Sequence, residues 1–148
     1  MLSKTFEPLK PYAPTLLRLM AGITFLVHGI AKLLNPAGFI GFVGSLGFPA
    51  PALFGWLVIL LEAAGGLLMI LGLWARPVAL GLVVEMLVTT FVVKSQIGFI
   101  APSGGGAGAE LDLMLLAASA AVMILGAGAL SIDENVLERG RVAEKQMA

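Results

Sequence analysis

Four long apolar segments constrain this chain more than any other feature of its sequence. They cover about residues 15–34, 51–74, 77–96 and 110–130. A helix needs about 20 apolar residues to cross the hydrocarbon core of a bilayer, and each segment reaches that length. The segments are continuously apolar rather than alternating, which disfavours the strands of a membrane barrel. The pattern therefore predicts an all-α integral membrane protein, a four-helix bundle that forms one domain over residues 1–148.

The composition agrees with a chain in contact with lipid. Hydrophobic residues make up 59% and charged residues 12%, whereas soluble domains carry about 25% charged residues. The formal net charge is zero, so nothing indicates a nucleic-acid partner. The chain has no cysteine and one histidine. These counts exclude disulfides, thiolate metal sites and a bis-histidine haem within one chain, and we expect no metal site.

The basic residues predict how the bundle is oriented. In a four-helix topology only Lys32 and Lys94 fall on one side of the membrane. Cytoplasmic segments are enriched in Lys and Arg, so both termini should be cytoplasmic and residues 134–148 should form a cytoplasmic tail. The other seven basic residues lie on the side of the termini: Lys4, Lys10, Arg18, Arg76, Arg139, Arg141 and Lys145.

Residues 38–51 connect the first two spans on the outer side. Phe39, Phe42, Val43 and Leu46 follow helical spacing, so we expect a short interfacial helix. An apolar loop packed over the bundle is an equally good interpretation.

Ionisable residues inside the spans are the candidate functional residues, because a charge at membrane depth costs several kcal/mol unless it is paired, neutralised or hydrated. His28 and Lys32 are four residues apart and share one face of the first helix. Glu62 lies near the middle of the second helix, beside Gly65 and Gly66, which permit close helix approach. Glu62 should therefore face the bundle interior, where His28 or Lys32 could reach it.

The third and fourth helices carry three more acids. Glu85 should lie deeper in the membrane, where we expect a structural role. Glu110 and Asp112 open the fourth helix, and acids in a first turn also stabilise the helix dipole. The two residues point in nearly opposite directions because they are two apart. Glu110 shares its face with small residues and with Met114, so we expect Glu110 rather than Asp112 to face the interior.

The predicted depths bring several of these residues together in the outer half of the bundle, under residues 98–108. Carboxyl groups outnumber cations there, and burial with like-charge repulsion favours at least one protonated carboxyl. Such a group beside a histidine could move protons to or from a redox-active ligand, although it could equally be inert. The negative excess suits a neutral ligand such as a quinone ring. The converging residues are His28, Lys32, Glu62 and Glu110.

Short motifs also follow one another in a fixed order over about residues 15–133. They are His28-Gly29-x-x-Lys32, Gly47-Phe48-Pro49, Glu62-x-x-Gly65-Gly66, Gly72-Leu73-x-x-Arg76, Glu110 and the closing stretch 126–133. Together they resemble the DoxX family of small bacterial and archaeal membrane proteins. Glu85 departs from the apolar third helix expected in that family.

The resemblance implies a multi-pass protein of the bacterial or archaeal cytoplasmic (inner) membrane. It also implies a quinone-linked redox protein or a subunit of a membrane oxidoreductase complex, because the related DoxD proteins are subunits of a thiosulfate:quinone oxidoreductase. The polar positions that the resemblance implies are His28, Lys32, Glu62, Arg76 and Glu110.

These observations lead to one main hypothesis. His28, Glu62 and Glu110 would act on a quinone, with His28 bonding a ring carbonyl and the two acids exchanging protons. Lys32 would stabilise the anionic reduced form, and Glu85 and Asp112 would complete the binding site.

Two alternatives stay open, so the sequence does not decide whether the chain is an enzyme. It could be a non-catalytic scaffold or accessory subunit in contact with other membrane subunits or with its own copies. It could also form a pathway for small solutes or protons.

Overall fold

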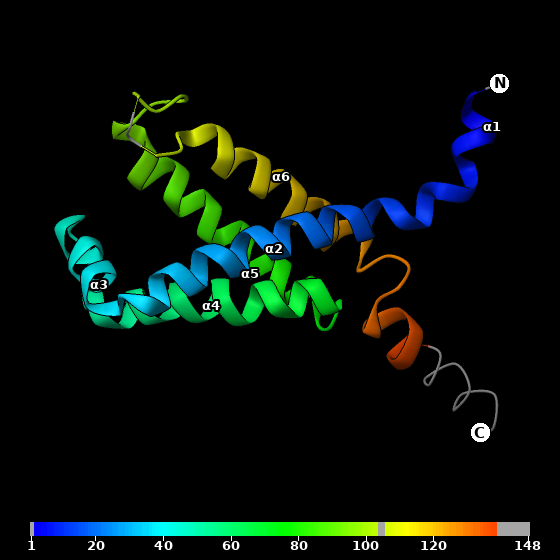
Figure 1. Ribbon diagram of the computed structural model, residues 1–148, viewed down its shortest axis with the longest axis horizontal. Coiled ribbons are helices and arrows are strands. Elements are labelled where there is room, and N and C mark those ends of the chain that lie inside the picture. The colour runs from blue at the N-terminus through cyan, green and yellow to red at the C-terminus, as the bar shows by residue number, and fades with distance from the viewer. Residues whose placement is uncertain (1, 104–105, 139–148) are drawn as a thin grey trace.

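The computed structural model describes residues 2–103 and 106–138, and every regular element in these ranges is a helix (Figure 1). The predicted all-helical architecture is therefore confirmed. Six α-helices follow one another: α1 Leu2–Phe6, α2 Ala13–Leu34, α3 Pro36–Ser45, α4 Pro51–Leu71, α5 Ala75–Val88 and α6 Ala109–Leu125. Short 3-10 turns cover Glu7–Tyr12 and Lys94–Gln96, and π-helical turns cover Thr89–Val93 and Asp133–Glu138.

Three helical stretches are long and apolar enough to cross a membrane: Lys4–Leu34, Pro51–Leu71 and Ala75–Gln96. Helix α6 has 17 residues and rises about 26 Å, at the lower end of the range for a span. The first and last described elements, α1 and the turn Asp133–Glu138, lie at one end of the molecule, whereas α3 and the start of α6 lie at the other (Figure 1). We call these the terminal end and the distal end. This arrangement suits an even number of crossings.

Two of the predicted helix ends are wrong, and glycines explain both. Helix α4 ends at Leu71 rather than at 74, because Gly72 takes the left-handed conformation at φ 66° and terminates the helix. Helix α6 ends at Leu125 rather than at 130, because Gly126 has φ 92°. The short helix expected within residues 38–51 is present as α3. Its first turn is capped by Asn35, whose Oδ1 accepts a hydrogen bond of 3.1 Å from the Gly38 N–H.

Helices α2 and α4 touch through their backbones. A Cβ atom on Gly29 would lie 2.3 Å from the Ala63 nitrogen, and one on Gly66 would lie 2.5 Å from the Leu26 nitrogen. Only glycine fits at these two positions, so the glycines set the separation of the two helices.

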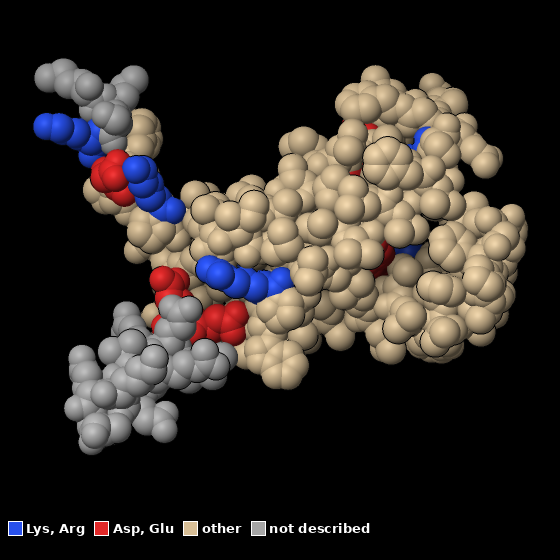
Figure 2. All heavy atoms as spheres, turned by 180° about the vertical axis from the view of Figure 1, so that it is seen from behind, with Lys and Arg blue, Asp and Glu red and all other residues tan. Residues whose placement is uncertain are grey.

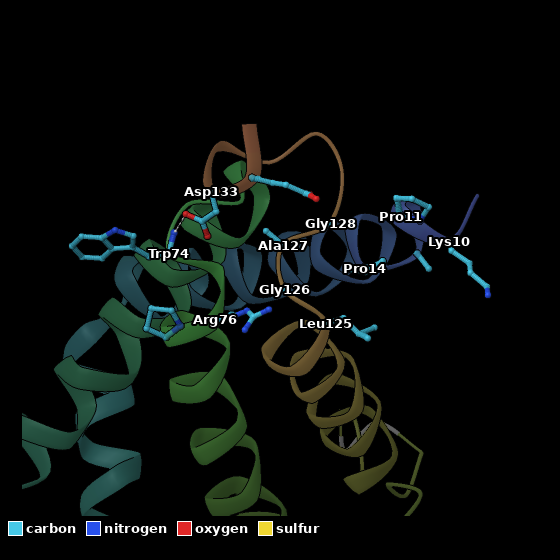
Figure 3. Close-up of a pocket in the computed structure, with 13 residues that line it drawn as sticks. Lys10, Pro11, Pro14, Trp74, Arg76, Leu125, Gly126, Ala127, Gly128 and Asp133 are labelled. Atoms are coloured by element: carbon cyan, nitrogen blue, oxygen red, sulfur yellow. Dashed lines mark hydrogen bonds between the residues drawn. The ribbon is translucent and has the colours of Figure 1, made fainter. Parts of the chain in front are cut away.

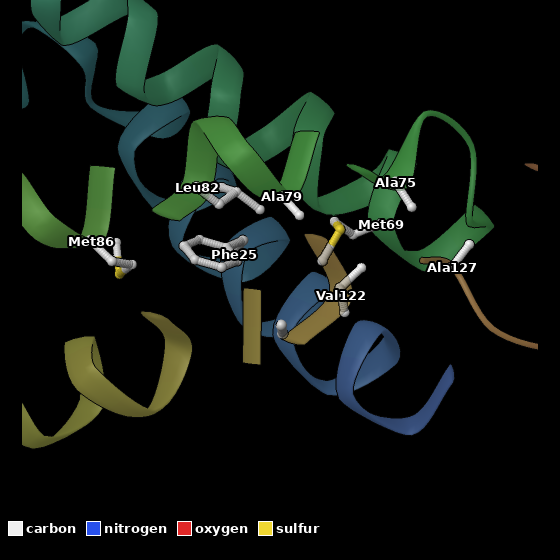
Figure 4. Close-up of a cluster of buried hydrophobic side chains, with 9 residues drawn as sticks. Phe25, Met69, Ala75, Ala79, Leu82, Met86, Val122 and Ala127 are labelled. Atoms are coloured by element: carbon white, nitrogen blue, oxygen red, sulfur yellow. The ribbon is translucent and has the colours of Figure 1, made fainter. Parts of the chain in front are cut away.

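A small apolar core fills the space between α2, α4, α5 and α6 (Figure 4). Phe25 is 1% exposed, and Met69, Leu82 and Val122 are 0% exposed. Most other large apolar side chains point outward; Met114, for example, is 72% exposed. An apolar exterior around a small core is the pattern of a bundle surrounded by lipid.

At the terminal end, the Arg18 side chain connects α2 to the end of α4 and to the chain after α6. Its sequence position did not reveal this role. We expected it only as a basic residue on the cytoplasmic side, but its side chain is 1% exposed. The guanidinium donates hydrogen bonds to four carbonyl oxygens, on Met69 and Ile70 of α4 and on Ala127 and Leu130 after α6. Arg18 therefore satisfies the C-terminal carbonyls of α4 and holds the chain that follows α6.

Asp133 satisfies free backbone groups at the start of α5, as Arg18 does at the end of α4. Its two carboxylate oxygens accept hydrogen bonds from the backbone N–H groups of Trp74, at 2.9 Å, and Ala75, at 2.8 Å. The carboxylate thereby caps the N-terminus of α5, where a negative charge is favourable.

Candidate functional site

Each of the four long helices contributes one ionisable side chain to a buried cluster in the distal half of the bundle. Lys32 comes from α2, Glu62 from α4, Glu85 from α5 and Asp112 from α6. The three acids are buried, with exposed fractions of 5%, 6% and 7% in that order. Glu85 lies within electrostatic reach of the other three groups. We call these four residues the polar cluster.

Lys32 and Glu62 form the ion pair of the polar cluster. The Lys32 ammonium donates to Glu62 Oε2, and its nitrogen also lies 5.2 Å from the ring centroid of Phe39 in α3, within the range of a cation–π contact. Gly29, one turn earlier in α2, allows the backbone to touch α4 at Glu62 and so brings the pair together. Lys32 is thus held between an acid and an aromatic ring.

The remaining acids of the polar cluster have oxygens without partners. In residues 2–103 and 106–138, both Glu85 oxygens and Asp112 Oδ2 are buried and accept no hydrogen bond. The hydroxyls of Ser119, on the same face of α6, and Thr90, in the π-helical turn after α5, are unpaired in the same way. Buried polar atoms are nearly always hydrogen-bonded, so each exception requires a functional or structural explanation. Single π-turns within helices are also frequent at functional sites.

The polar cluster is accessible from one side. Lys32 keeps 20% of its side-chain surface exposed. Figure 2 shows a hollow at the distal end, between the α3 side and the α5–α6 side, in which acidic and basic atoms are recessed. Over the described ranges, no three acidic or histidine side chains are arranged to hold a metal ion. The arrangement suits hydrogen bonding and proton exchange with a ligand that enters the hollow.

The structure corrects the predicted place of His28. We expected His28 or Lys32 to reach Glu62, and Lys32 does so. The His28 side chain is exposed on the surface of α2, because the helix turns Gly29 rather than His28 toward α4. His28 therefore does not join the polar cluster.

The choice between the two acids of α6 was also wrong. Asp112 is buried and faces the other helices together with Ser119 and Val122. Glu110 is half-buried: its Oε1 accepts a hydrogen bond of 3.2 Å from the Gly108 N–H at the start of the helix, and its Oε2 is buried without a partner in the described ranges. Met114, which marked the face that we expected to be internal, is 72% exposed.

The depth of Glu85 also differs from the prediction, whereas Arg76 lies on the side of the termini as expected. Glu85 was expected to lie deeper than the other candidates, but it lies within electrostatic reach of Glu62, Lys32 and Asp112. Arg76 is exposed at the start of α5, nine residues before Glu85 and so about 14 Å away along the helix. The connection predicted to cover the site includes residues 104–105, which lie outside the described part. The predicted cytoplasmic tail beyond residue 138 also lies outside the described residues.

Comparison with known proteins places the chain in a family. A model of the DoxX family matches residues 13–95. The chain is 30% identical over 137 residues to a Bacillus subtilis protein named "Putative oxidoreductase CatD", covering 93% of each chain. It is 31% identical over 138 residues to a Haemophilus influenzae protein named "Uncharacterized protein", covering 90% of this chain and 97% of the relative.

A third relative is the "Inner membrane protein YphA" of Escherichia coli, 23% identical over 135 residues, with 88% of this chain and 94% of the relative covered. No solved structure matches. The family match covers more than half of the chain, and the relatives are aligned over nearly all of it. This membrane protein belongs to the DoxX family.

Proposed function

We propose that this protein is a quinone-linked redox protein or a quinone-binding subunit of a membrane oxidoreductase complex. The proposal places it in the bacterial or archaeal inner membrane with both termini in the cytoplasm. One observation carries it: buried carboxyl oxygens of Glu85 and Asp112, which lie within electrostatic reach of the Lys32–Glu62 pair or of each other, accept no hydrogen bond in the described part of the chain.

These unpaired oxygens argue against a purely structural role for the polar cluster. A cluster that only holds helices together would gain most if each polar atom bonded a neighbouring helix. In the described ranges the Lys32–Glu62 bond joins α2 to α4, whereas neither Glu85 oxygen accepts a hydrogen bond. Leaving a buried polar group unpaired costs about 1–3 kcal/mol. A ligand that bonds these oxygens would recover that free energy.

The charges of the polar cluster favour a neutral ligand with oxygens that both accept and donate hydrogen bonds. Three acids face one cation, which disfavours a bound anion. A quinone carbonyl accepts from Lys32 or from a protonated carboxyl, and a quinol hydroxyl donates to a carboxylate. The same residues would thus bind both oxidation states, and a quinone reaches them from the bilayer.

The proposed roles follow from position. Glu85 and Asp112 exchange protons with the ring oxygens, Lys32 bonds one ring oxygen, and Glu62 holds Lys32 in place. His28, one turn from Lys32 on the surface of α2, lines the entry instead of the ring site. Glu110 stabilises the start of α6 by accepting a hydrogen bond from the Gly108 N–H.

Reduction of a quinone takes two electrons and two protons. The polar cluster supplies a route for the protons. We assign the electrons to a second protein of the complex, since the sequence has no cysteine for an iron–sulfur cluster. The name of the Bacillus subtilis relative supports the oxidoreductase class.

Titration of the purified protein in lipid nanodiscs with a short-chain ubiquinone or menaquinone analogue tests the proposal. We expect saturable binding that Glu85→Gln and Asp112→Asn each weaken at least about tenfold, a change of about 1.4 kcal/mol. His28→Ala should have a smaller effect. Glu7→Gln is the control, because Glu7 is an exposed acid paired with Lys10 at the terminal end.

Circular dichroism and gel filtration would verify that each variant is folded. No saturable binding, or binding that neither Glu85→Gln nor Asp112→Asn changes, would refute the quinone site. Co-purification of a stoichiometric partner that carries all the activity would then favour the accessory subunit.

A further inference from the structure

The terminal end contains a pocket that the proposed quinone site does not use (Figure 3). It has a volume of about 790 Å³ and lies where α4 and α6 end and where α2 and α5 begin. We name it the terminal pocket. Cations, acids and apolar side chains all line it, among them Lys10, Trp74, Arg76, Leu125, Asp133 and Glu134.

Arg76 is the cation available to a ligand in the terminal pocket, which the exposed acid Glu134 also lines. Lys10 already pairs with Glu7 at 2.7 Å, and both oxygens of Asp133 are bonded to the start of α5. Arg76 is exposed and forms no ion pair within the described ranges. In Figure 3 its guanidinium extends from α5 toward Leu125 and Gly126 at the end of α6.

Hydrogen bonds fix the backbone of residues 127–129, of which Ala127 and Gly128 line the terminal pocket. Arg18 Nε donates to the Ala127 carbonyl at 3.0 Å, and the Ala129 N–H donates to the Pro11 carbonyl at 3.0 Å. The Thr15 hydroxyl donates to the Ala129 carbonyl. Gly128 is required here, because its φ is 72° and a Cβ atom would lie 2.8 Å from the Thr15 nitrogen. A ligand would therefore meet a preformed surface, which lowers the free-energy cost of binding.

The position of the terminal pocket identifies the class of ligand. The long helices end around it, so it lies at the level where the hydrocarbon core meets the lipid head groups. Trp74 and Leu125 beside it are 65% and 59% exposed, and tryptophan is enriched at that level of a membrane. An unpaired guanidinium there matches a phosphate, which arginine binds through two parallel hydrogen bonds.

We propose that the terminal pocket binds the phosphate of a glycerophospholipid head group, with Arg76 as the phosphate ligand. The acyl chains would continue over the apolar surface past Leu125. The site would fix one lipid to the terminal end of the bundle, independently of the polar cluster.

Native mass spectrometry of the delipidated protein tests the assignment. Phosphatidylglycerol would be titrated, with diacylglycerol as the lipid that lacks phosphate. We expect one phosphatidylglycerol bound per chain, at least tenfold weaker binding to Arg76→Gln, and intermediate binding to Arg76→Lys, which keeps the charge but loses the planar fork. Lys4→Gln is the matched control, since Lys4 is exposed at the same end and does not line the terminal pocket.

Several results would overturn the proposal. If Arg76→Gln bound phosphatidylglycerol as wild type does, or if diacylglycerol bound as tightly as phosphatidylglycerol, the pocket would not recognise phosphate. Displacement of the lipid by millimolar inorganic phosphate would identify a soluble phosphate compound as the ligand. Quinone titration should be the same for Arg76→Gln and wild type, so failure of either proposal can be recognised separately.

Discussion

The contact between α2 and α4 provides the sharpest test of the structure, through the substitution Gly29→Ala. The added Cβ atom would lie 2.3 Å from the Ala63 nitrogen and 2.7 Å from the Glu62 carbonyl carbon. Both are backbone atoms, so no side-chain rotation relieves the clash. Ordinary contact begins at 3.4 Å, and the two helices must therefore separate by about 1 Å.

The free-energy change can be approximated from two opposing effects. Overpacking of a close contact costs about 1–3 kcal/mol, and a backbone clash belongs at the upper end. Alanine is favoured over glycine within a helix by up to about 1 kcal/mol, which offsets part of this cost. We therefore expect Gly29→Ala to lower the free energy of unfolding by about 2 kcal/mol. The quinone analogue should also bind more weakly, because the separation moves Lys32 away from Glu62.

Gly41→Ala is the matched control, because Gly41 lies in α3 and a Cβ atom there has nothing within 4 Å. Unfolding would be followed by circular dichroism in mixed micelles of increasing dodecyl sulfate content. The control should be neutral or more stable by up to about 1 kcal/mol, from helix propensity alone. If Gly29→Ala were as stable as Gly41→Ala, the close packing of α2 on α4 would be wrong.

Three further predictions concern charged side chains that bond other segments of the chain, each measured as thermal unfolding in detergent. Arg18→Met should lower stability by about 3 kcal/mol or more, because four carbonyl oxygens lose their donor; an unchanged melting temperature would contradict the burial of Arg18. Lys32→Met should cost about 2–3 kcal/mol, since it leaves the buried Glu62 unpaired. Combining it with Glu62→Gln should recover part of the loss, and an additive double variant would argue against the ion pair. Asp133→Asn should cost about 1 kcal/mol, because one of the two cap bonds at the start of α5 is lost; a gain in stability would exclude the cap.

Several features could be predicted from the sequence because they are local. The length of each apolar segment determines that it can span a membrane, and the backbone of a span must satisfy its own hydrogen bonds as a helix. Glycines beside Glu62 indicated a close helix contact, and Lys32 was one of the two partners expected for Glu62. The spacing of Phe39, Phe42, Val43 and Leu46 indicated the short helix α3.

Other features depended on how the helices pack. The sequence could not show that Asp112 rather than Glu110 faces inward, that His28 faces outward, or that Arg18 is buried by carbonyls from α4 and from the chain after α6. A helix in a soluble protein reveals its inner face by polarity, whereas the spans here are apolar on nearly every side. The rotation of each helix about its axis therefore follows from shape and from a few polar contacts between distant segments, and only the tertiary structure decides these.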